Sequence, residues 1–463
     1  MSSLFGIIDI GLSALVAHRG AMDTEGHNLA NVDTPGYHRQ DALLTTNPGL
    51  PAVGSSMSLC GGQFGSGVQV TTVRRAQEAF LGLQTRMLKA TTGRWSSAAS
   101  PLREAESILS PGPGEDLSAR LDEFWNAWEN VANSPEDVSL RADLSESAST
   151  LADTFRSDTQ QLESTRLTVD SGIKSRVDEV NTLASQVGEL DRQISVAQAE
   201  GRSPNDILDT RDQSLERLSE LCGAMPFSSE GGQLIIYLDG RVLVQGESSY
   251  PISMTTGAGG VEIRSSYDNS TIQVANGEIG GLLYARDTGI PAYLDQLNTL
   301  AGTLVTEVNA RHRAGFGLDG VDQRDFFVAG GTAGDIALDP AIQADPRAIA
   351  TAQTADAPGD GSVALDIANL RTTAVLGGQS LGQVAQAMLG GVGNDIARAD
   401  TEVQAAGAAM DQIQQQEQSV SGVSIDEELT YLSEMQRAYE AGARIISVAN
   451  DLLGVVIEQM GVS

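Results

Sequence analysis

Apolar residues recur every seven positions at both ends of this chain, and this repeat is the strongest constraint on its fold. Near the start, Ile8, Leu15 and Met22 follow it, and near the end it runs from Ile425 to Met460. Such a stripe has to be covered, because each buried Leu or Ile contributes about 1.5 to 3 kcal/mol. The repeat therefore predicts a coiled coil between the two terminal helices. The predicted contact positions are Leu4, Ile8, Leu12, Leu15, Met22, Leu29, Ile425, Leu429, Leu432, Met435, Tyr439, Ile446, Leu453, Val456 and Met460.

The first helix is predicted to end within NLANVDTPGYHRQ, residues 28–40. Pro35 disfavours helix at the residue before it, and Gly36 permits the positive φ that a tight turn needs. Tyr37 is expected to anchor this turn by packing. Because chain starts are usually weakly specified, a break so clearly encoded indicates that the chain leaves the terminal helix at a fixed point. Gly442, within the final helix, is predicted to let a neighbouring backbone approach closely.

Helical spacing dominates the region between the two ends. Apolar residues continue at this spacing from Leu144 to Ile194, which predicts one very long helix ending near Gly201. Ser134 is expected to cap that helix with Pro135 at its first position, and Ser203 and Pro204 are expected to begin the next helix in the same way. The fold class is therefore mainly α and elongated, with small β-rich insertions.

Strand-like runs interrupt this helical pattern in the middle of the chain. Two of them flank Asp239-Gly240, which predicts a hairpin. A second β-containing portion is expected within 316–376, with a strand at Ile336 to Leu338. The predicted units are residues 1–46 with 425–463 as the terminal coiled-coil core, 47–222 with 284–315 and 377–424 as the helical bundle, and 223–283 with 316–376 as the β-rich portion.

Charge and cysteine content exclude several classes of protein. The formal net charge of −32 leaves no basic stripe for nucleic acid or for an anionic membrane surface. Cys60 and Cys222 are too few for a disulfide framework. Asp9 interrupts the first apolar run and no Lys or Arg precedes it, so a cleaved signal peptide is not expected. No run is expected to be long enough to span a bilayer.

Catalytic and metal-binding chemistry finds no support in the sequence. No histidine has a second ligand at metal spacing, and no carboxylate has a nucleophile or acid–base partner that the pattern identifies. The aspartates of LDGVDQRDFF, residues 318–327, do not have the spacing of a calcium loop. No cofactor, metal or enzymatic activity is therefore expected. The histidines are His18, His27 and His38, expected at a solvated face or in subunit contacts, and His312.

The two ends of the chain resemble those of bacterial flagellar rod, hook and hook-associated proteins. The resemblance is carried by NLANVDTPGYHRQ near the start and by LSEMQRAYEAGARIISVANDLLGVVI, residues 432–457, near the end. It implies that the two ends form the axial core of a helical assembly. A purely internal helical bundle is the alternative that the periodicity alone leaves open. The matching positions of the first motif are Asn28, Asn31, Thr34, Pro35, Gly36, Tyr37 and Arg39.

Segments of the interior resemble one member of this group, the hook-associated protein 1 family, which forms a hook–filament junction. These segments are LDEFWNAWENVANSPEDVSLRADL, SPNDILDTRDQSLERLSEL and LDQLNTLAGTLVTEVNARHRAGFGLDGVDQRDFF. The resemblance implies a structural subunit in the extracellular flagellum, exported by the flagellar type III apparatus. Its implied partners are further copies of itself, the hook protein, the second junction protein and an export chaperone at the C-terminal helix. Alternatives are a rod or hook subunit, or an extracellular enzyme or adhesive module on a flagellar-type scaffold.

Overall fold

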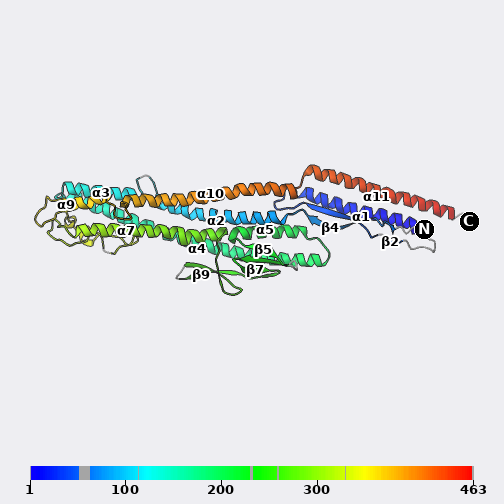
Figure 1. Cartoon of the computed structure of the whole chain (residues 1–463), viewed down its shortest axis with the longest axis horizontal. Helices are drawn as coiled ribbons and strands as arrows, with labels where there is room; N and C mark the ends of the chain where they lie inside the picture. The colour runs from blue at the N-terminus through cyan, green and yellow to red at the C-terminus, as the bar shows by residue number, and fades with distance from the viewer. Residues whose placement is uncertain are drawn as a thin grey trace.

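The computed structural model is a long helical body with both chain ends at one extremity (Figure 1). It describes residues 2–48, 50–51, 63–112, 114–229, 233–257, 260–328 and 330–460. Most elements run along the long axis, as expected for a mainly α, elongated chain. The helices are α1 (Ser2–Ala30), α2 (Ala79–Leu109), α3 (Leu117–Asn133), α4 (Val138–Ala199), α5 (Asn205–Cys222), α6 (Gly277–Tyr284), α7 (Ile290–His312), α8 (Pro340–Ala344), α9 (Ser362–Ala368), α10 (Leu381–Ser421) and α11 (Ile425–Met460).

The longest element is α4, whose 62 residues extend over about 93 Å at 1.5 Å per residue. Its extent agrees with the periodicity, but its start does not agree with the predicted cap. Asp137 caps the helix by accepting a hydrogen bond from the Ser139 N–H, whereas Ser134 ends α3. Similarly, α5 begins at Asn205 with Pro204 as its N-cap, so Ser203 is not the cap. Local sequence patterns locate such boundaries only to within a few residues.

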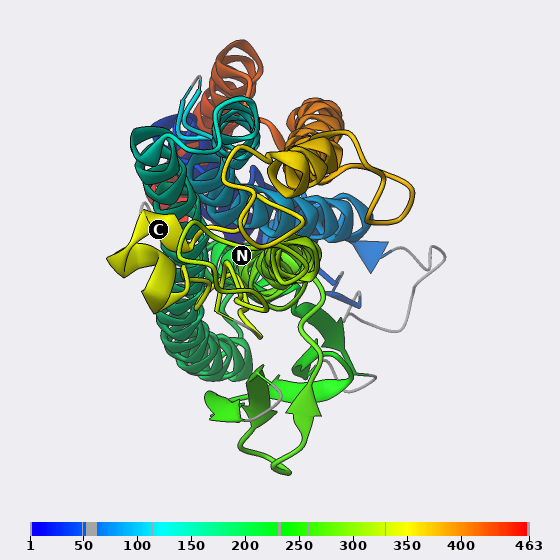
Figure 2. The same cartoon turned by 90° about the vertical axis from the view of Figure 1, so that its left-hand side faces the viewer.

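The strands form small antiparallel sheets. A four-stranded sheet of order β5-β6-β7-β8 and a three-stranded sheet of order β11-β10-β9 lie on one side of the helices (Figure 2). The predicted hairpin joins β6 to β7, with positive φ at both Asp239 and Gly240. The strands are β1 (Gln40–Thr46), β2 (Leu50–Pro51), β3 (Gln63–Phe64), β4 (Val68–Arg75), β5 (Met225–Ser228), β6 (Leu234–Leu238), β7 (Arg241–Gln245), β8 (Ser248–Ser249), β9 (Ile252–Gly257), β10 (Gly260–Ser265) and β11 (Thr271–Ile272).

Two large hydrophobic clusters stabilise the body. The first, here called the tip core, lies at the extremity away from the chain ends and joins α3, α7, α9 and parts of α4 and α10. The second, the sheet core, packs the strands of 225–272 against α4 and α5. A small third cluster lies around Trp95. The described residues of α1, β1, β4 and α11 belong to none of the three.

The segment 316–376 differs from its predicted structure. Ile336–Leu338 is not a strand, since Leu338 makes only an isolated bridge with Phe327. A short helix, α9, lies later in the segment. This segment contributes Phe326, Phe327 and Ile349 to the tip core, whereas residues 223–283 build the sheet core. The structure thus separates two stretches that the sequence placed in one β-rich portion, because β-prone composition does not determine which core a loop covers.

Candidate functional site

The terminal helices α1 and α11 pack together along their length, as the heptads predicted. Their direction is antiparallel, because Gly11 lies against Gly442 whereas Asn28, further along α1, reaches back to Glu428. A Cβ added to Gly11 would lie 2.6 Å from Cγ1 of Ile446 and 3.3 Å from the carbonyl oxygen of Gly442. A Cβ added to Gly442 would lie 3.4 Å from Cβ of Ala14 and 3.5 Å from the carbonyl oxygen of Gly11, which are ordinary contact distances, so the close approach of the two helices requires glycine at Gly11 rather than at Gly442.

Small residues on α1 fill much of the buried surface of the terminal helices. Ala17, Ala21 and Thr24 are buried there at a spacing of three to four, as is Ala449 on α11. The predicted heptad residues are mostly half-buried: Ile8, Leu15, Met22, Leu29, Leu432, Met435, Ile446, Leu453 and Val456. The structure leaves the remaining ones exposed: Leu12, Ile425, Leu429 and Tyr439. The side chains of Leu4 and Met460, like all of Cys60, lie outside the described residues.

A second apolar stripe on α11, absent from the prediction, is exposed over much of its surface, although Ile445 at its start also lies near Gly11 of α1. It consists of Ile445, Val448, Leu452 and Val455, spaced by three or four residues. Val448 is 58% exposed, although it lies within a mostly apolar helix. The outer face of α1 carries similar exposed side chains, namely Phe5, Leu12 and Val16. The paired helices thus present two uncovered apolar faces, here called the outer faces of α11 and α1.

The length of α1 corrects one prediction. Phe5–Ala30 is long and apolar enough to cross a membrane by length and composition alone. The prediction that no apolar run is long enough to span a bilayer is therefore wrong. In this structure the same stretch packs along α11 and against β1 and β4.

The turn after α1 has the expected geometry. Gly36 has a φ of +74°, which favours glycine, and its added Cβ would lie 2.3 Å from Nε2 of Gln213. That same Nε2 donates a hydrogen bond of 2.7 Å to the carbonyl oxygen of Pro35. Thr34 closes the helix end by donating from its backbone N–H to the carbonyl oxygen of Asn31 at 2.9 Å. The turn is therefore fixed by contacts with α5 as well as by its own sequence.

Asn28 is fully buried and uses its whole side-chain amide. Its Oδ1 accepts hydrogen bonds from the Gln40 N–H at 2.9 Å and from the Tyr37 hydroxyl at 2.7 Å. Its Nδ2 donates to the Gln40 carbonyl at 2.9 Å and to Oε2 of Glu428 at 3.0 Å. Tyr37 therefore anchors the turn through its hydroxyl, and burial raises the pKa of that hydroxyl. Three of these bonds hold the turn to the end of α1, and the fourth, to Glu428, connects it to α11.

Arg39 provides the second connection to α11. Its Nε lies 2.9 Å from Oε1 of Glu428, and its guanidinium lies over the ring of Tyr431 at 5.6 Å. Its backbone N–H donates to the carbonyl oxygen of Ser421, at the end of α10. Glu428 is only 1% exposed, so it is a buried partner of Asn28 and Arg39.

The start of α5 meets the same turn, which the sequence did not reveal. Nε2 of Gln40 donates to Asp206 at 2.9 Å, and Nδ1 of His38 lies 2.8 Å from Oδ1 of Asp209. The hydrogen bond to Asp209 raises the pKa of His38 above its ordinary value. Arg75 of β4 pairs with Asp209 and also with Asp212, at 2.6 Å and 3.0 Å. We call this cluster of turn, α5 start and α11 start the polar joint.

The histidines take part in structure rather than in metal binding. His27 lies 3.3 Å from Asp206 of α5 while its side chain stays 42% exposed, and His38 contacts Asp209 of the same helix. His312 is fully buried, with Nδ1 against the carbonyl oxygen of Arg324 and Nε2 accepting from the Ala350 N–H. Within the part of the chain that the structure describes, no group of three or more His, Cys, Asp or Glu side chains is arranged to hold a metal ion.

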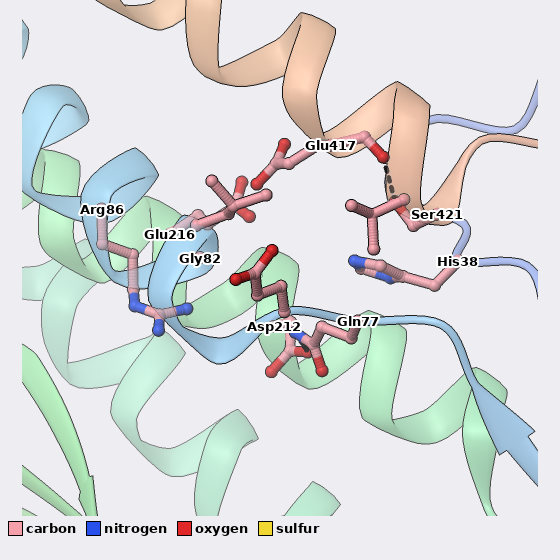
Figure 3. A pocket seen from close by; sticks show the side chains of 11 residues that line it. His38, Gln77, Gly82, Arg86, Asp212, Glu216, Glu417 and Ser421 are labelled. Carbon is pink, nitrogen blue, oxygen red and sulfur yellow. Dashed lines mark hydrogen bonds between the residues drawn. The ribbon is translucent and has the colours of Figure 1, made fainter.

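A small pocket adjoins the polar joint (Figure 3). Its carboxylates come from α5, from α10 and from Glu78 at the start of α2, and Glu417 of α10 accepts a hydrogen bond from the Thr85 hydroxyl at 3.1 Å. The sequence showed no nucleophile or acid–base pair here, and the pocket contains side chains that also hold helices together. Labelled side chains of this pocket are His38, Gln77, Arg86, Asp212, Glu216, Glu417 and Ser421.

Sequence comparisons match three parts of the chain to flagellar families. Residues 102–327 match the flagellar hook-associated protein FlgK helical domain. Residues 8–38 match the flagella basal body rod protein family, and residues 414–460 match the flagellar basal body rod FlgEFG protein C-terminal family. The two rod-type matches contain the turn motif and the terminal helices, whereas the first contains most of the body.

Two relatives that match over the whole chain have the same name. The chain is 27% identical to flagellar hook-associated protein 1 of Bacillus subtilis, over 100% of this chain and 99% of that protein. It is 25% identical to the Escherichia coli protein of that name, over 99% of this chain and 100% of that protein. Among solved structures, the flagellar hook junction protein FlgK from Burkholderia pseudomallei matches with a TM-score of 0.65 at 17% identity, over 73% of this chain and 100% of that chain. That likeness supports the fold.

Proposed function

Because this chain belongs to the flagellar hook-associated protein 1 family, we propose that the outer faces of α1 and α11 are the surfaces through which it assembles. As a member of that family it is a structural component of the extracellular flagellum, at the junction between hook and filament, and not an enzyme. The predicted family and function are thereby confirmed. The role of individual residues in assembly remains a prediction.

One observation carries the proposal about the surfaces. Ile445, Val448, Leu452 and Val455 form a continuous exposed apolar stripe on a helix whose opposite face is already covered by α1. An exposed stripe of this kind lowers solubility unless a partner covers it. Phe5 and Val16, 55% and 65% exposed, offer a second such surface on the same pair of helices. Two different faces on one pair of helices suit a heterologous contact that repeats from copy to copy.

The arrangement of the body supports the same proposal. The polar joint holds the terminal helices at one extremity of the body, while the tip core lies at the other. An assembly made through the outer faces would therefore leave α3, α9 and the two sheets of β5 to β11 away from the contact surface. We further propose the hook protein and the second junction protein as axial neighbours, and an export chaperone bound to α11 before assembly. Type III export of the chain is proposed on the same basis.

Gene deletion in a motile host tests the junction role. The expected result is cells with complete hooks, without filaments, that release flagellin into the medium. Cells without hooks would instead indicate a rod or hook subunit, and normal filaments would contradict the junction role in that host.

Complementation of the same deletion tests the proposed surface. We expect Val448→Asp to be produced and folded but to restore few or no filaments, because a charge within the stripe opposes burial by a neighbour. Leu167→Asp is the matched control, since Leu167 is also an exposed apolar residue on a helix, at 68% exposure, but lies on α4 in the body. Equal filament numbers for both variants would exclude the outer face of α11 as an assembly surface.

A further inference from the structure

Two carboxyl groups meet at the buried start of α11. Glu428 is 1% exposed and receives the Nδ2–H of Asn28. Glu25, one turn before Asn28 on α1, is half-buried and faces Glu428. Oε2 of Glu25 is buried and has no hydrogen-bond partner among the described residues. The carboxyl pair therefore lies where α1 and α11 are in contact, within the polar joint.

The charges around the pair do not balance when both carboxyl groups are ionised. Arg39 is the cation paired with Glu428, and it is shared with Asp41, whose Oδ1 lies 3.6 Å from its Nη2. One guanidinium thus faces three carboxyl groups. Two carboxylates in one partly buried site repel each other, so the site retains a proton. Burial, and next the facing carboxyl of Glu428, raise the pKa of Glu25 to about 8.

We propose that the Glu25–Glu428 pair is a proton-dependent latch that fastens the start of α11 to α1. With one proton shared, a carboxyl group can donate to a carboxylate and the contact closes. When that proton is lost, two negative charges face each other across the helix contact and the start of α11 loosens. The charged and titratable groups that face the pair are Arg39 and Asp41 after the turn, Tyr37 within it, and Tyr431 on α11.

The direction of the pH effect follows from proton binding. Glu25 holds its proton in the folded chain at pH values where an unfolded chain has released it. Stability from this site is therefore present at low pH and is lost as pH rises through about 8. The latch acts within one chain, so this inference does not depend on the proposed assembly surfaces.

Hydrogen exchange on the full-length chain tests the latch. Amide protection in residues 425–435, corrected for the intrinsic pH dependence of exchange, is measured at about pH 7 and about pH 9, on either side of the Glu25 pKa. We expect protection in the wild type to fall by up to about tenfold over that interval, as the protonated fraction falls. Protection in the tip core should not change. Equal amide protection of residues 425–435 at the two pH values in the wild type would overturn the proposal.

Substitutions of the two carboxyl groups sharpen the test. Glu25→Gln replaces the protonated group by a neutral amide, so protection should be the same at both pH values. Glu428→Gln removes the facing charge and should weaken the pH dependence without abolishing it, because burial still raises the pKa of Glu25. Glu427→Gln is the matched control, because Glu427 is an exposed carboxylate on the same helical turn, and it should behave as the wild type. A pH-dependent loss of protection that persists in Glu25→Gln would contradict the latch.

Infrared spectroscopy gives a readout that does not depend on exchange. The difference between wild type and Glu25→Gln at about pH 7, below the pKa of Glu25, should contain the band of a protonated carboxylic acid, and this band should vanish by about pH 9. The subtraction removes the contribution of other buried carboxyl groups, Asp158 in particular. Absence of the band at about pH 7 would show that the pair holds no proton, and would overturn the inference.

Discussion

At the tip, Phe124, Trp128 and Phe326 are fully buried against each other, whereas the opposite extremity is held by small residues and polar groups. There Ala17 and Ala21 fill the contact around α1, and a hydrogen bond from Asn28 to Glu428 connects α1 to the start of α11. Large aromatic side chains bury enough apolar surface to stabilise a fold within one chain. The terminal helices leave apolar residues on their surface instead. The body thus buries its large apolar side chains within one chain, whereas the terminal helices leave theirs exposed, as the proposed assembly surfaces require.

Amide hydrogen exchange of the purified chain should show the largest difference between the two regions. We expect protection in the tip core to exceed that at the far ends of α1 and α11 by several orders of magnitude, because local opening there breaks few buried contacts. Protection within α11 should be highest near Glu428, at the polar joint, and should fall toward Leu453. Uniform strong protection of both terminal helices in a monomer would instead support a purely internal bundle.

Substitution in the tip core should be the most destabilising single change. Phe124→Ala is expected to lower the free energy of unfolding of the body by about 3 to 5 kcal/mol, through the lost apolar surface and the cavity left behind. Leu452→Ala, at an exposed position of α11, should change it by less than about 0.5 kcal/mol in the isolated chain. Urea unfolding followed by tryptophan fluorescence measures both. Similar losses in the free energy of unfolding for the two variants would contradict the proposed difference in packing between the tip core and the terminal helices.

Substitution of Asp158, on the long helix α4, should have a smaller effect on stability than Phe124→Ala, and should raise stability instead of lowering it. It is 6% exposed, and burial raises its pKa to about 7. Its stabilising protonated form is lost as pH rises through about 7, so Asp158→Asn should stabilise the chain at higher pH, by up to about 2 kcal/mol. The gain should disappear near pH 4, where Asp158 is protonated. Asp153→Asn, at an exposed carboxylate on the same helix, should show no such pH dependence.

The turn at Gly36 should respond more weakly in stability but strongly in assembly. Gly36→Val places a β-branched residue at positive φ and forces Gln213 away from Pro35, at an expected cost of about 1 to 2 kcal/mol. Because the turn fixes where the chain leaves α1, incorporation into the flagellum should be blocked while synthesis continues. Gly26→Val, at a position with open space around it, is the control. Normal incorporation of the Gly36→Val variant would show that the turn is not needed for assembly.

Much of the fold could be predicted from the sequence because its signals are local. The extents of α4 and α11 follow from apolar residues at helical spacing, and the β6–β7 hairpin follows from Asp239 and Gly240. Repeats at both ends were sufficient to predict that α1 and α11 pair. Caps were less certain, since Ser134 and Asp137 are both suitable caps and only Asp137 has its side chain at the start of α4.

Tertiary structure alone decided which surfaces meet. The contact between the turn at Pro35 and Gln213 joins residues 178 positions apart, and the buried pairing of Asn28 with Glu428 joins residues 400 apart. Polar side chains leave no periodic signal of such partners. The apolar faces of α11 are likewise equivalent in sequence, so packing against α1 determined that Ala449 is buried and Val448 exposed. The sequence by itself determined the helices, and the three-dimensional arrangement determined which of their faces remain available to neighbours.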